Sequence, residues 1–302
     1  MLKNLSLVVV IGLISYFVKA DSGHSHKHAS LPTDMLIGPL IESGGGLTGG
    51  NTSGKLITSL HGFLSAPNSK PGAAGSYYLN QGKKELTITI DDGPTPKVTE
   101  AVLDVLKKHN LKATFFILGA KVSYQKKVLK RMVDEGHIIG NHSLNHKKLG
   151  KVGFFFFSKK IRKEIIDSHK LMEPYMVNSP KWYFRPPYGS WVKKAAKVIN
   201  KTEYGNNYYG PILWDIGGSL QSSTTGTIKR AADWGCWSKK WTVDQCLSGY
   251  IYETDEKKGG VVLFHDLKME SVELIDRYIT HYKNNPEYRF VSLEDLNIKD
   301  NY

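Results

Sequence analysis

The sequence predicts an α/β fold built on a parallel sheet, and two observations support this prediction. From Leu86 onward, short apolar runs rich in β-branched residues alternate with longer stretches of helical periodicity. Polar residues capable of chemistry stand directly after several of these runs. Because reacting groups gather at the carboxyl ends of parallel strands, the pattern predicts a site at that edge of an open sheet or a barrel.

The first element is a strand over Thr87–Ile90, where Thr and Ile alternate. Asp91 and Asp92 follow it, and Gly93-Pro94 then ends the strand and turns the chain. Adjacent strand residues point to opposite faces, so the two carboxylates are expected to have different roles unless the turn has already begun. An ordinary Asp-Asp-Gly turn is the structural alternative.

The remaining elements follow in chain order. Thr95 can cap a helix that has Pro96 at its first position and continues past Val98. A later helix ends at Gly136, and Ser158 can cap another. We expect strands over 113–118, 137–140, 212–216 and 261–264, and helices over 122–133, 158–172 and 272–282.

The first 20 residues have the composition of a secretory signal peptide. Lys3 precedes an apolar run from Leu5 to Val18, and small residues end the segment at Ala20. The run is short for a membrane span, which favours cleavage over a retained anchor. We therefore expect an exported protein, periplasmic or extracellular, with no stable membrane span after cleavage.

Residues 21–82 are rich in Gly and Ser and poor in apolar periodicity, and we interpret them as an extension or a strap over the domain. The tract His24–His28 could bind a metal loosely, but a solvated tail is favoured. The catalytic domain is then expected over residues 83–302.

The charge of the chain is strongly basic, at +13. Loss of Lys3 and Lys19 with the signal peptide would leave +11. This charge suits an anionic surface such as a cell-wall polymer, and it would also suit a membrane or a nucleic acid. We find no nucleic-acid-binding motif, so nucleic acid is not an expected partner.

Cys236 and Cys246 are the only cysteines. An exported chain with two cysteines is expected to form one disulfide. A zinc-binding pair is the alternative, but no second Cys or His pair flanks these residues.

Two imidazoles at His142 and His146 stand four residues apart, which would place them on one face of a helical turn. This spacing suits two ligands of one metal, although two surface histidines would be the ordinary interpretation of the pair alone. Together with Asp92, the pair forms a His-His-Asp set that leaves a coordination position open for water or substrate. Open sites of this kind are catalytic.

Four segments in order resemble the signature motifs of the polysaccharide deacetylase family. They are Thr-Ile-Asp91-Asp92-Gly-Pro, His142-Ser-Leu-Asn-His146, Arg185-Pro-Pro-Tyr188-Gly189 and Leu263-Phe-His265-Asp266. These carbohydrate esterases remove N- or O-acetyl groups from chitin, peptidoglycan, xylan and related polymers. The resemblance runs from about Leu86 to Leu296 and implies a distorted (β/α) barrel with about seven parallel strands.

The resemblance also implies a role for each matching residue. Asp92, His142 and His146 would bind a divalent metal, usually zinc. Asp91 would be the general base for the attacking water, which a carboxylate beside a metal can be. Arg185 would pair with Asp91 and keep it ionised.

Further roles follow from the same resemblance. The backbone N–H of Tyr188 would help to stabilise the oxyanion, and His265 would protonate the leaving sugar amine. Leu263 and Trp182 would line the pocket for the acetyl methyl group. Pro187 and Trp214 complete the expected substrate-binding set.

One segment departs from the family pattern. The family usually has Trp-x-x-Asp-x-x-Asp-Trp before the last strand, whereas Trp214-Asp215 is followed by Gly217 at the first expected Asp. An Asp-Trp pair occurs only later, at Asp233. We therefore expect a lengthened loop, closed by the disulfide, in which Asp233 rather than Asp215 orients His265.

Several aromatic residues permit two interpretations. Trp237 and Trp241 in the lengthened loop could stack on sugar rings or pack against the barrel. For the run Phe154–Phe157, packing is favoured, with one or two rings on the rim as a platform for sugar or lipid.

Together these features predict an exported, metal-dependent hydrolase of linear amide bonds that removes N-acetyl groups from a cell-wall polymer, most simply peptidoglycan. The alternatives are a chitin or chitooligosaccharide deacetylase, an O-acetyl xylan-type esterase, and a catalytically inactive glycan-binding protein. The expected cofactor is Zn²⁺, the expected partner is a polysaccharide, and we expect a monomer.

Overall fold

The computed structural model describes residues 82–153 and 155–296. The segment 1–20, expected to be a signal peptide, the segment 21–81 with its His24–His28 tract, and Phe154 lie outside the described residues. Within the described part of the chain, no helix is both long enough and apolar enough to cross a membrane.

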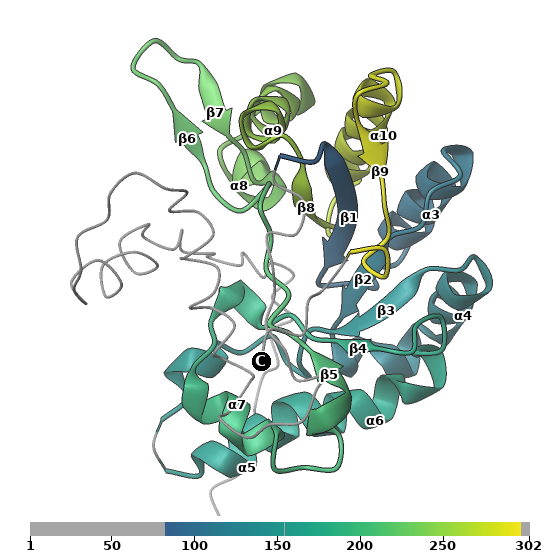
Figure 1. Ribbon diagram of the computed structural model, residues 1–302, viewed down its shortest axis with the longest axis vertical. Helices are drawn as coiled ribbons and strands as arrows, with labels where there is room; N and C mark the ends of the chain where they lie inside the picture. Colours follow the sequence, from purple (N-terminus) through teal and green to yellow (C-terminus); the bar gives the residue numbers. More distant parts are fainter. Residues whose placement is uncertain (1–81, 154, 297–302) are drawn as a thin grey trace, which may run out of the picture.

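A parallel sheet forms the centre of the molecule (Figure 1). Its strand order is β3-β2-β1-β8, and β9 pairs with the amino end of β1. In the register of the sheet, Asp91 lies beside Phe116 on one side and His265 on the other. The strand bounds are β1 Glu85–Asp91, β2 Thr114–Ile117, β3 Ile138–Asn141, β8 Gly260–His265 and β9 Arg289–Phe290.

Parallel pairing continues beyond both edges of this sheet. A bridge between Asn141 and Phe184 joins β3 to a second parallel pair, β4 (Trp182–Tyr183) and β5 (Tyr208–Tyr209). On the far side, Ile216 pairs with Val262 of β8. The strands thus curve into a distorted (β/α) barrel, the expected fold, although strand pairing among the described residues does not close the ring.

The strand expected over 212–216 is reduced to the single bridge at Ile216. The Arg185 side chain donates hydrogen bonds to the carbonyl oxygens of Ile212, at 2.8 Å, and Leu213, at 3.0 Å. The carbonyl oxygens of Ile212 and Leu213, which would otherwise be free to pair with a neighbouring strand, therefore accept from a side chain, and Pro211 just before them has no N–H to offer.

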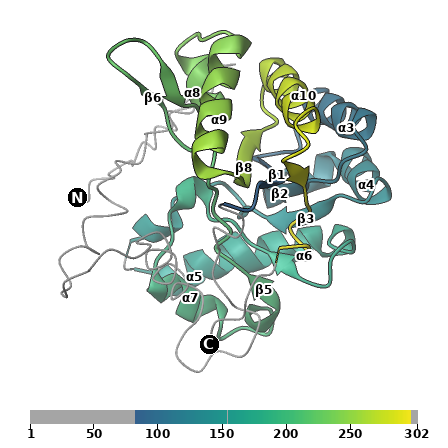
Figure 2. The same cartoon turned by 45° about the horizontal axis from the view of Figure 1, so that its top comes forward.

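Helices cover the sheet in two groups (Figures 1 and 2). The first group packs with the apolar side chains of β1, including Ile88 and Ile90, to form the main core. The second surrounds a smaller core beyond β3. The first group comprises α3 Val98–Lys108, α4 Lys126–Asp134, α9 Val243–Lys257 and α10 Met269–Lys283. The second comprises α5 Phe157–Arg162, a π-helical turn Lys163–Asp167 and α7 Lys193–Ile199. Helix α6, Ser168–Met172, follows the π-helical turn and buries Met172 in the main core.

Two expected helix starts are wrong. The first helix begins at Val98, and Lys97 rather than Thr95 precedes it, with φ of 66°. The Thr95 N–H instead donates to Thr99 Oγ1 at 2.6 Å, which fixes the turn before the helix. Ser158 lies inside α5 rather than at its cap, because the helix begins one residue earlier.

The sequence patterns did not reveal the lengthened loop's own structure. It contains an antiparallel hairpin of β6 (Gln221–Ser222) and β7 (Ile228–Arg230), followed by α8 (Asp233–Ser238). In Figure 1 the hairpin projects beside α9. Short 3₁₀ turns complete the described structure at Gly119–Tyr124, Leu149–Lys151, Glu173–Tyr175, Pro187–Gly189 and Gly205–Asn207.

Candidate active site

Both carboxylates at the end of β1 reach the same cluster of side chains. Asp92 has φ of 74°, so the turn begins at this residue and the strand alternation no longer separates it from Asp91. Asp91 Oδ2 lies 3.6 Å from His142 Nε2, and Asp92 Oδ1 lies 3.3 Å from the same atom. A Cβ on Gly93 would lie 2.3 Å from Asp266 Oδ2, so the next position requires glycine.

The two histidines lie on an irregular loop and not on the expected helical turn. Ser143 has φ of 71° and His146 has φ of 57°, a left-handed backbone that a helix excludes. The Ser143 N–H donates to Asn141 Oδ1 at 2.9 Å, and the His146 N–H donates to Ser143 Oγ at 3.1 Å. These local hydrogen bonds replace helical ones and turn both imidazoles toward Asp92.

Glu164, a buried residue of the π-helical turn, holds the loop that carries His142 and His146 in place. Glu164 accepts hydrogen bonds from Asn145 N, at 2.8 Å, and Asn145 Nδ2, at 3.1 Å. Its own carbonyl accepts the Leu144 N–H at 2.7 Å. Glu164 and Asn141 were missed at the sequence level, because single polar residues in a helical or strand pattern carry no signal of what they bind.

Asp92, His142 and His146 fit the requirements of a metal site. Their ligand atoms all lie within 4.8 Å of one another, and His146 Nε2 is 3.0 Å from Asp92 Oδ1. His142 Nδ1 lies 2.8 Å from the Arg185 carbonyl oxygen, which can only accept, so Nδ1 carries the proton and Nε2 is left as the ligand. Asp92 Oδ1 is buried and receives no hydrogen bond from the described residues.

The charge state of the cluster also favours a cation. Burial would raise the pKa of Asp92, but the adjacent imidazoles of His142 and His146 hold it well below its usual range. Asp92 is therefore an ionised carboxylate. One carboxylate and two imidazoles form a donor set typical of catalytic zinc, with room for a further ligand.

Arg185 lies fully buried beside Asp91. Its Nη1 donates to Asp91 Oδ1 at 2.7 Å and to Thr89 Oγ1 at 2.9 Å. The guanidinium carbon lies 4.2 Å from the centre of the Phe116 ring, and 5.6 Å from that of Trp214. Together with the two carbonyls described above, these contacts fix the guanidinium in one position. The sequence did not identify Thr89 as a member of this network.

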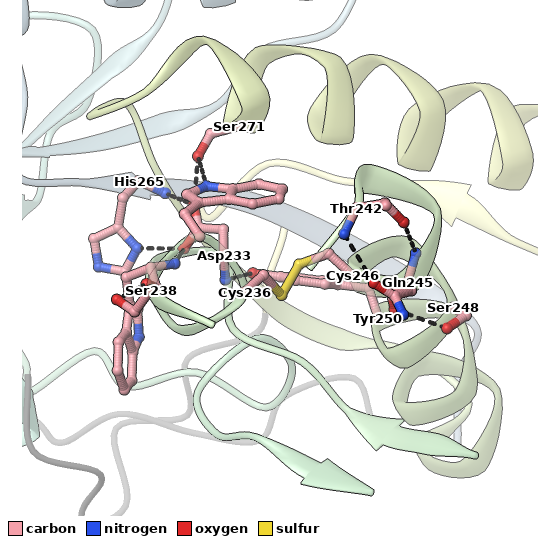
Figure 3. Close-up of a disulfide and its surroundings, with 12 residues drawn as sticks. Asp233, Cys236, Ser238, Thr242, Gln245, Cys246, Ser248, Tyr250, His265 and Ser271 are labelled. Atoms are coloured by element: carbon pink, nitrogen blue, oxygen red, sulfur yellow. Dashed lines mark hydrogen bonds and ion pairs between the residues drawn. A yellow bond between two sulfur atoms is a disulfide. The ribbon is translucent and has the colours of Figure 1, made fainter. Parts of the chain in front are cut away.

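His265 ends β8 and faces Asp91 across the sheet register. Asp233, the first residue of α8, contacts it twice (Figure 3). Oδ1 lies 2.8 Å from His265 Nδ1, and Oδ2 accepts the His265 backbone N–H at 2.7 Å. Asp215 instead accepts the Val261 N–H at 2.8 Å, near the opposite end of β8. The structure thus brings Asp233, and not Asp215, to the histidine.

The environment of His265 favours its protonated form. Burial lowers the pKa of this imidazole, but the charge and hydrogen bond of Asp233, and the charges of Asp92 and Asp91, raise it to about 9. Ser271 Oγ also donates to Asp233 Oδ2, at 3.1 Å, which helps to hold the carboxylate in place.

The expected disulfide joins Cys236 of α8 to Cys246 of α9, so the zinc-pair alternative for these cysteines is wrong. Trp237 Nε1 donates to Ser271 Oγ at 3.0 Å, and both Trp237 and Trp241 pack partly buried against the main core. Packing, rather than sugar stacking, accounts for these two rings. Figure 3 shows how the disulfide and Ser271 flank Asp233.

The expected substrate-binding residues separate into two groups. Leu263 is two residues before His265, so it lies on the same face of β8, and it pairs with Thr89. The Tyr188 ring packs 4.6 Å from the His146 ring, and Pro187 is buried beside it in the chain. Of these residues Tyr188 contacts a candidate ligand directly, whereas Trp214 packs against Arg185 and Leu263 lies in the sheet register beside Thr89.

Trp182 does not belong to this group, and its assignment to the pocket is wrong. It precedes Arg185 by three residues, so its side chain lies on the opposite face of the strand. Its ring packs 4.2 Å from His169 and 5.7 Å from Tyr208, beneath the helices of the second core.

Asp266 is a buried carboxylate that the sequence motif contained without a role. It accepts a hydrogen bond from Thr99 Oγ1 at the start of α3. Burial raises the pKa of Asp266 to about 7. The hydrogen bond from Thr99 ties the end of β8 to the start of α3.

The fold and the site define a (β/α) barrel with a candidate metal site of one carboxylate and two imidazoles, near two buried charged pairs, Asp91 with Arg185 and His265 with Asp233. Residues 79–206 match the family model described as polysaccharide deacetylase. This match identifies a domain of the polysaccharide deacetylase family in the chain.

Known relatives have similar sequences and folds. The peptidoglycan-N-acetylglucosamine deacetylase PgdA of Listeria monocytogenes is 31% identical over 214 residues, which cover 70% of this chain and 39% of that protein. The peptidoglycan-N-acetylmuramic acid deacetylase PdaA of Bacillus subtilis is 29% identical, covering 78% of this chain and 84% of its own. This chain thus spans well under half of the Listeria protein.

Solved structures of related proteins have a similar fold. The peptidoglycan deacetylase PdaC from Bacillus subtilis is 26% identical with a TM-score of 0.54, over 72% of this chain and 91% of that one. A family 4 carbohydrate esterase from Bacillus anthracis is 25% identical with a TM-score of 0.56, over 85% and 96%.

Proposed function

We propose that this chain is an exported, metal-dependent deacetylase that hydrolyses N-acetyl groups of amino sugars in peptidoglycan. The observation that carries the proposal is the pair of buried couples, Asp91 with Arg185 and His265 with Asp233, on the two sides of one candidate metal site. The names of the relatives support peptidoglycan as the polymer. Export rests on the composition of residues 1–20.

Asp92, His142 and His146 would hold the metal, zinc in the first instance. A divalent metal there would supply polarisation of the acetyl carbonyl and a lower pKa for the attacking water. Asp91 would accept the proton of that water. Its hydrogen bond from Arg185, at 2.7 Å, fixes Oδ1 and leaves Oδ2 facing the cluster, 3.6 Å from His142 Nε2.

His265 would protonate the departing sugar nitrogen. An amide nitrogen is a poor leaving group without a proton, so the high pKa of this imidazole, about 9, suits the task at neutral pH. The Tyr188 backbone N–H would stabilise the developing oxyanion. Leu263, Trp214 and Pro187 would surround the acetyl group and the sugar.

Acetate release from purified peptidoglycan and from chitin oligomers, with zinc and with chelator, tests the proposal. Zinc-dependent release from peptidoglycan is expected. Release from chitin oligomers alone would keep the mechanism and replace the substrate. A zinc-loaded protein that releases acetate from neither would contradict catalysis. The fold alone does not decide this, because a pseudoenzyme from Bacillus anthracis, 23% identical, shares it with a TM-score of 0.55.

A further inference from the structure

An exposed aromatic and basic surface lies beyond the metal-ligand loop. Phe155 and Phe156 are 79% and 74% exposed, whereas the adjacent Phe157 is buried in the second core. The exposed basic residues around them are Lys151, Lys159, Lys160, Arg162 and Lys163. We call these seven residues the Phe–Lys patch.

The backbone at Phe156 gives no structural reason for a phenylalanine. The residue directly precedes α5 with φ of 61° and ψ of 21°, a left-handed conformation that glycine or asparagine adopts more readily. Helix caps also favour small polar residues. An exposed ring at this position therefore costs free energy twice, through the backbone and through its hydration. Neither cost is offset by packing within the described chain.

The charge around the rings has one sign. Residues 147–163 include seven Lys or Arg and no Asp or Glu. Helix α7, which packs beside α5 in Figures 1 and 2, adds exposed Lys193, Lys194 and Lys197. Lys194 Nζ lies 4.7 Å from the centre of the Phe157 ring, so the two basic helices form one surface.

This surface is continuous with the rim of the candidate active site. Lys148 Nζ lies 4.8 Å from the centre of the Tyr188 ring, which itself packs on His146. The Gly150 N–H donates to the Ser190 carbonyl at 3.0 Å, which joins the two loops. The loop that leads into the patch at Lys151 is therefore joined to the loop of Tyr188, whose ring packs on the candidate ligand His146.

We propose that the Phe–Lys patch docks the protein onto an anionic lipid bilayer. Phenylalanine has no polar group for sugar hydroxyls, and an exposed pair of such rings amid lysines is typical of interfacial membrane insertion. The cations match the negative surface of anionic lipids. Docking would hold the active site against the membrane face. The proposal does not depend on catalysis, so the two can fail separately.

A fluorophore at the patch tests the docking directly. Because both native cysteines are bonded to each other, Phe155→Cys would provide the only thiol for an environment-sensitive label. We expect a blue shift on adding phosphatidylglycerol vesicles and little change with phosphatidylcholine vesicles. The matched control is Val177→Cys, at a residue that is 62% exposed but outside the patch, where no shift is expected.

Substitutions give a second readout. Phe155→Ser with Phe156→Gly removes both rings and relieves the left-handed strain, so the protein should fold, while vesicle affinity falls about tenfold or more. Lys159→Gln with Lys160→Gln should weaken binding about tenfold. Lys126 and Lys127 on α4 are also exposed and lie outside the patch, so they provide the control. Their change to Gln should have a smaller effect.

Three outcomes would overturn the proposal. If the protein sediments with vesicles but the label at position 155 does not shift, another segment carries the membrane binding. If the label shifts with insoluble peptidoglycan and not with vesicles, the patch is a glycan platform. The proposal would also be rejected if either double variant of the patch, Phe155→Ser with Phe156→Gly or Lys159→Gln with Lys160→Gln, kept full affinity for the vesicles.

Discussion

Replacing Asp233 with Asn removes the charge that sets the protonation of His265. The two side chains are buried and joined by a hydrogen bond of 2.8 Å between Oδ1 and Nδ1. A hydrogen bond to a charged group contributes about 1.5–3 kcal/mol. Because one pKa unit corresponds to about 1.4 kcal/mol, the pKa of His265 should fall by about one to two units from about 9.

The sign follows from the role of His265 as an acid. A general acid works while protonated, so activity is present below its pKa and is lost as the pH rises through that value. In Asp233→Asn the alkaline limb of the pH profile should therefore move about one to two units toward lower pH. The effect should be large for an N-acetyl sugar and small for an activated acetyl ester, whose leaving group departs without a proton.

The assay is acetate release as a function of pH, with metal content and the thermal unfolding midpoint measured on the same samples. Asp215→Asn is the matched control, because its carboxylate binds the Val261 N–H at 2.8 Å. It should leave the alkaline limb in place. An unchanged limb in Asp233→Asn, or an equal shift in both variants, would refute the reasoning.

Other substitutions test the remaining parts of the site. His142→Ala should lower metal content as measured by elemental analysis, whereas Asp91→Asn should retain the metal and lose about 10²–10⁴-fold in acetate release. Arg185→Gln should lower the free energy of unfolding in urea by about 3–5 kcal/mol, because it leaves Asp91 buried without its cation. Cys246→Ser should cost about 2–4 kcal/mol in the same measurement by removing the disulfide. A stable Arg185→Gln protein would show that the ion pair is dispensable for folding.

Much of the site could be predicted because its residues follow strand ends in the sequence. Asp91, Asp92 and His265 belong to patterns that local alternation and a following turn make visible. Their meeting in space then follows from the parallel sheet. Asp233 could also be named, because an Asp-Trp pair near the cysteines replaced the missing family residue.

Other features depend on contacts that no local pattern records. The histidine loop was expected to be helical from its spacing, but Asn141 and Glu164 hold it in a left-handed path. Trp182 was placed in the pocket by the family resemblance, and the strand alternation turns it to the opposite face. The strand at 212–216 is interrupted by the Arg185 side chain, a contact between distant residues.

The pairing of β1 with β8 brings together two parts of the site that lie far apart in the chain. Thr89 and Val262, which are hydrogen-bonded, stand 173 residues apart in the chain. The candidate ligands all come from residues 92–146, in the first half of the described domain. The ligand set thus comes from one stretch of the chain, whereas the acid His265 joins it only through the pairing of β8 with β1.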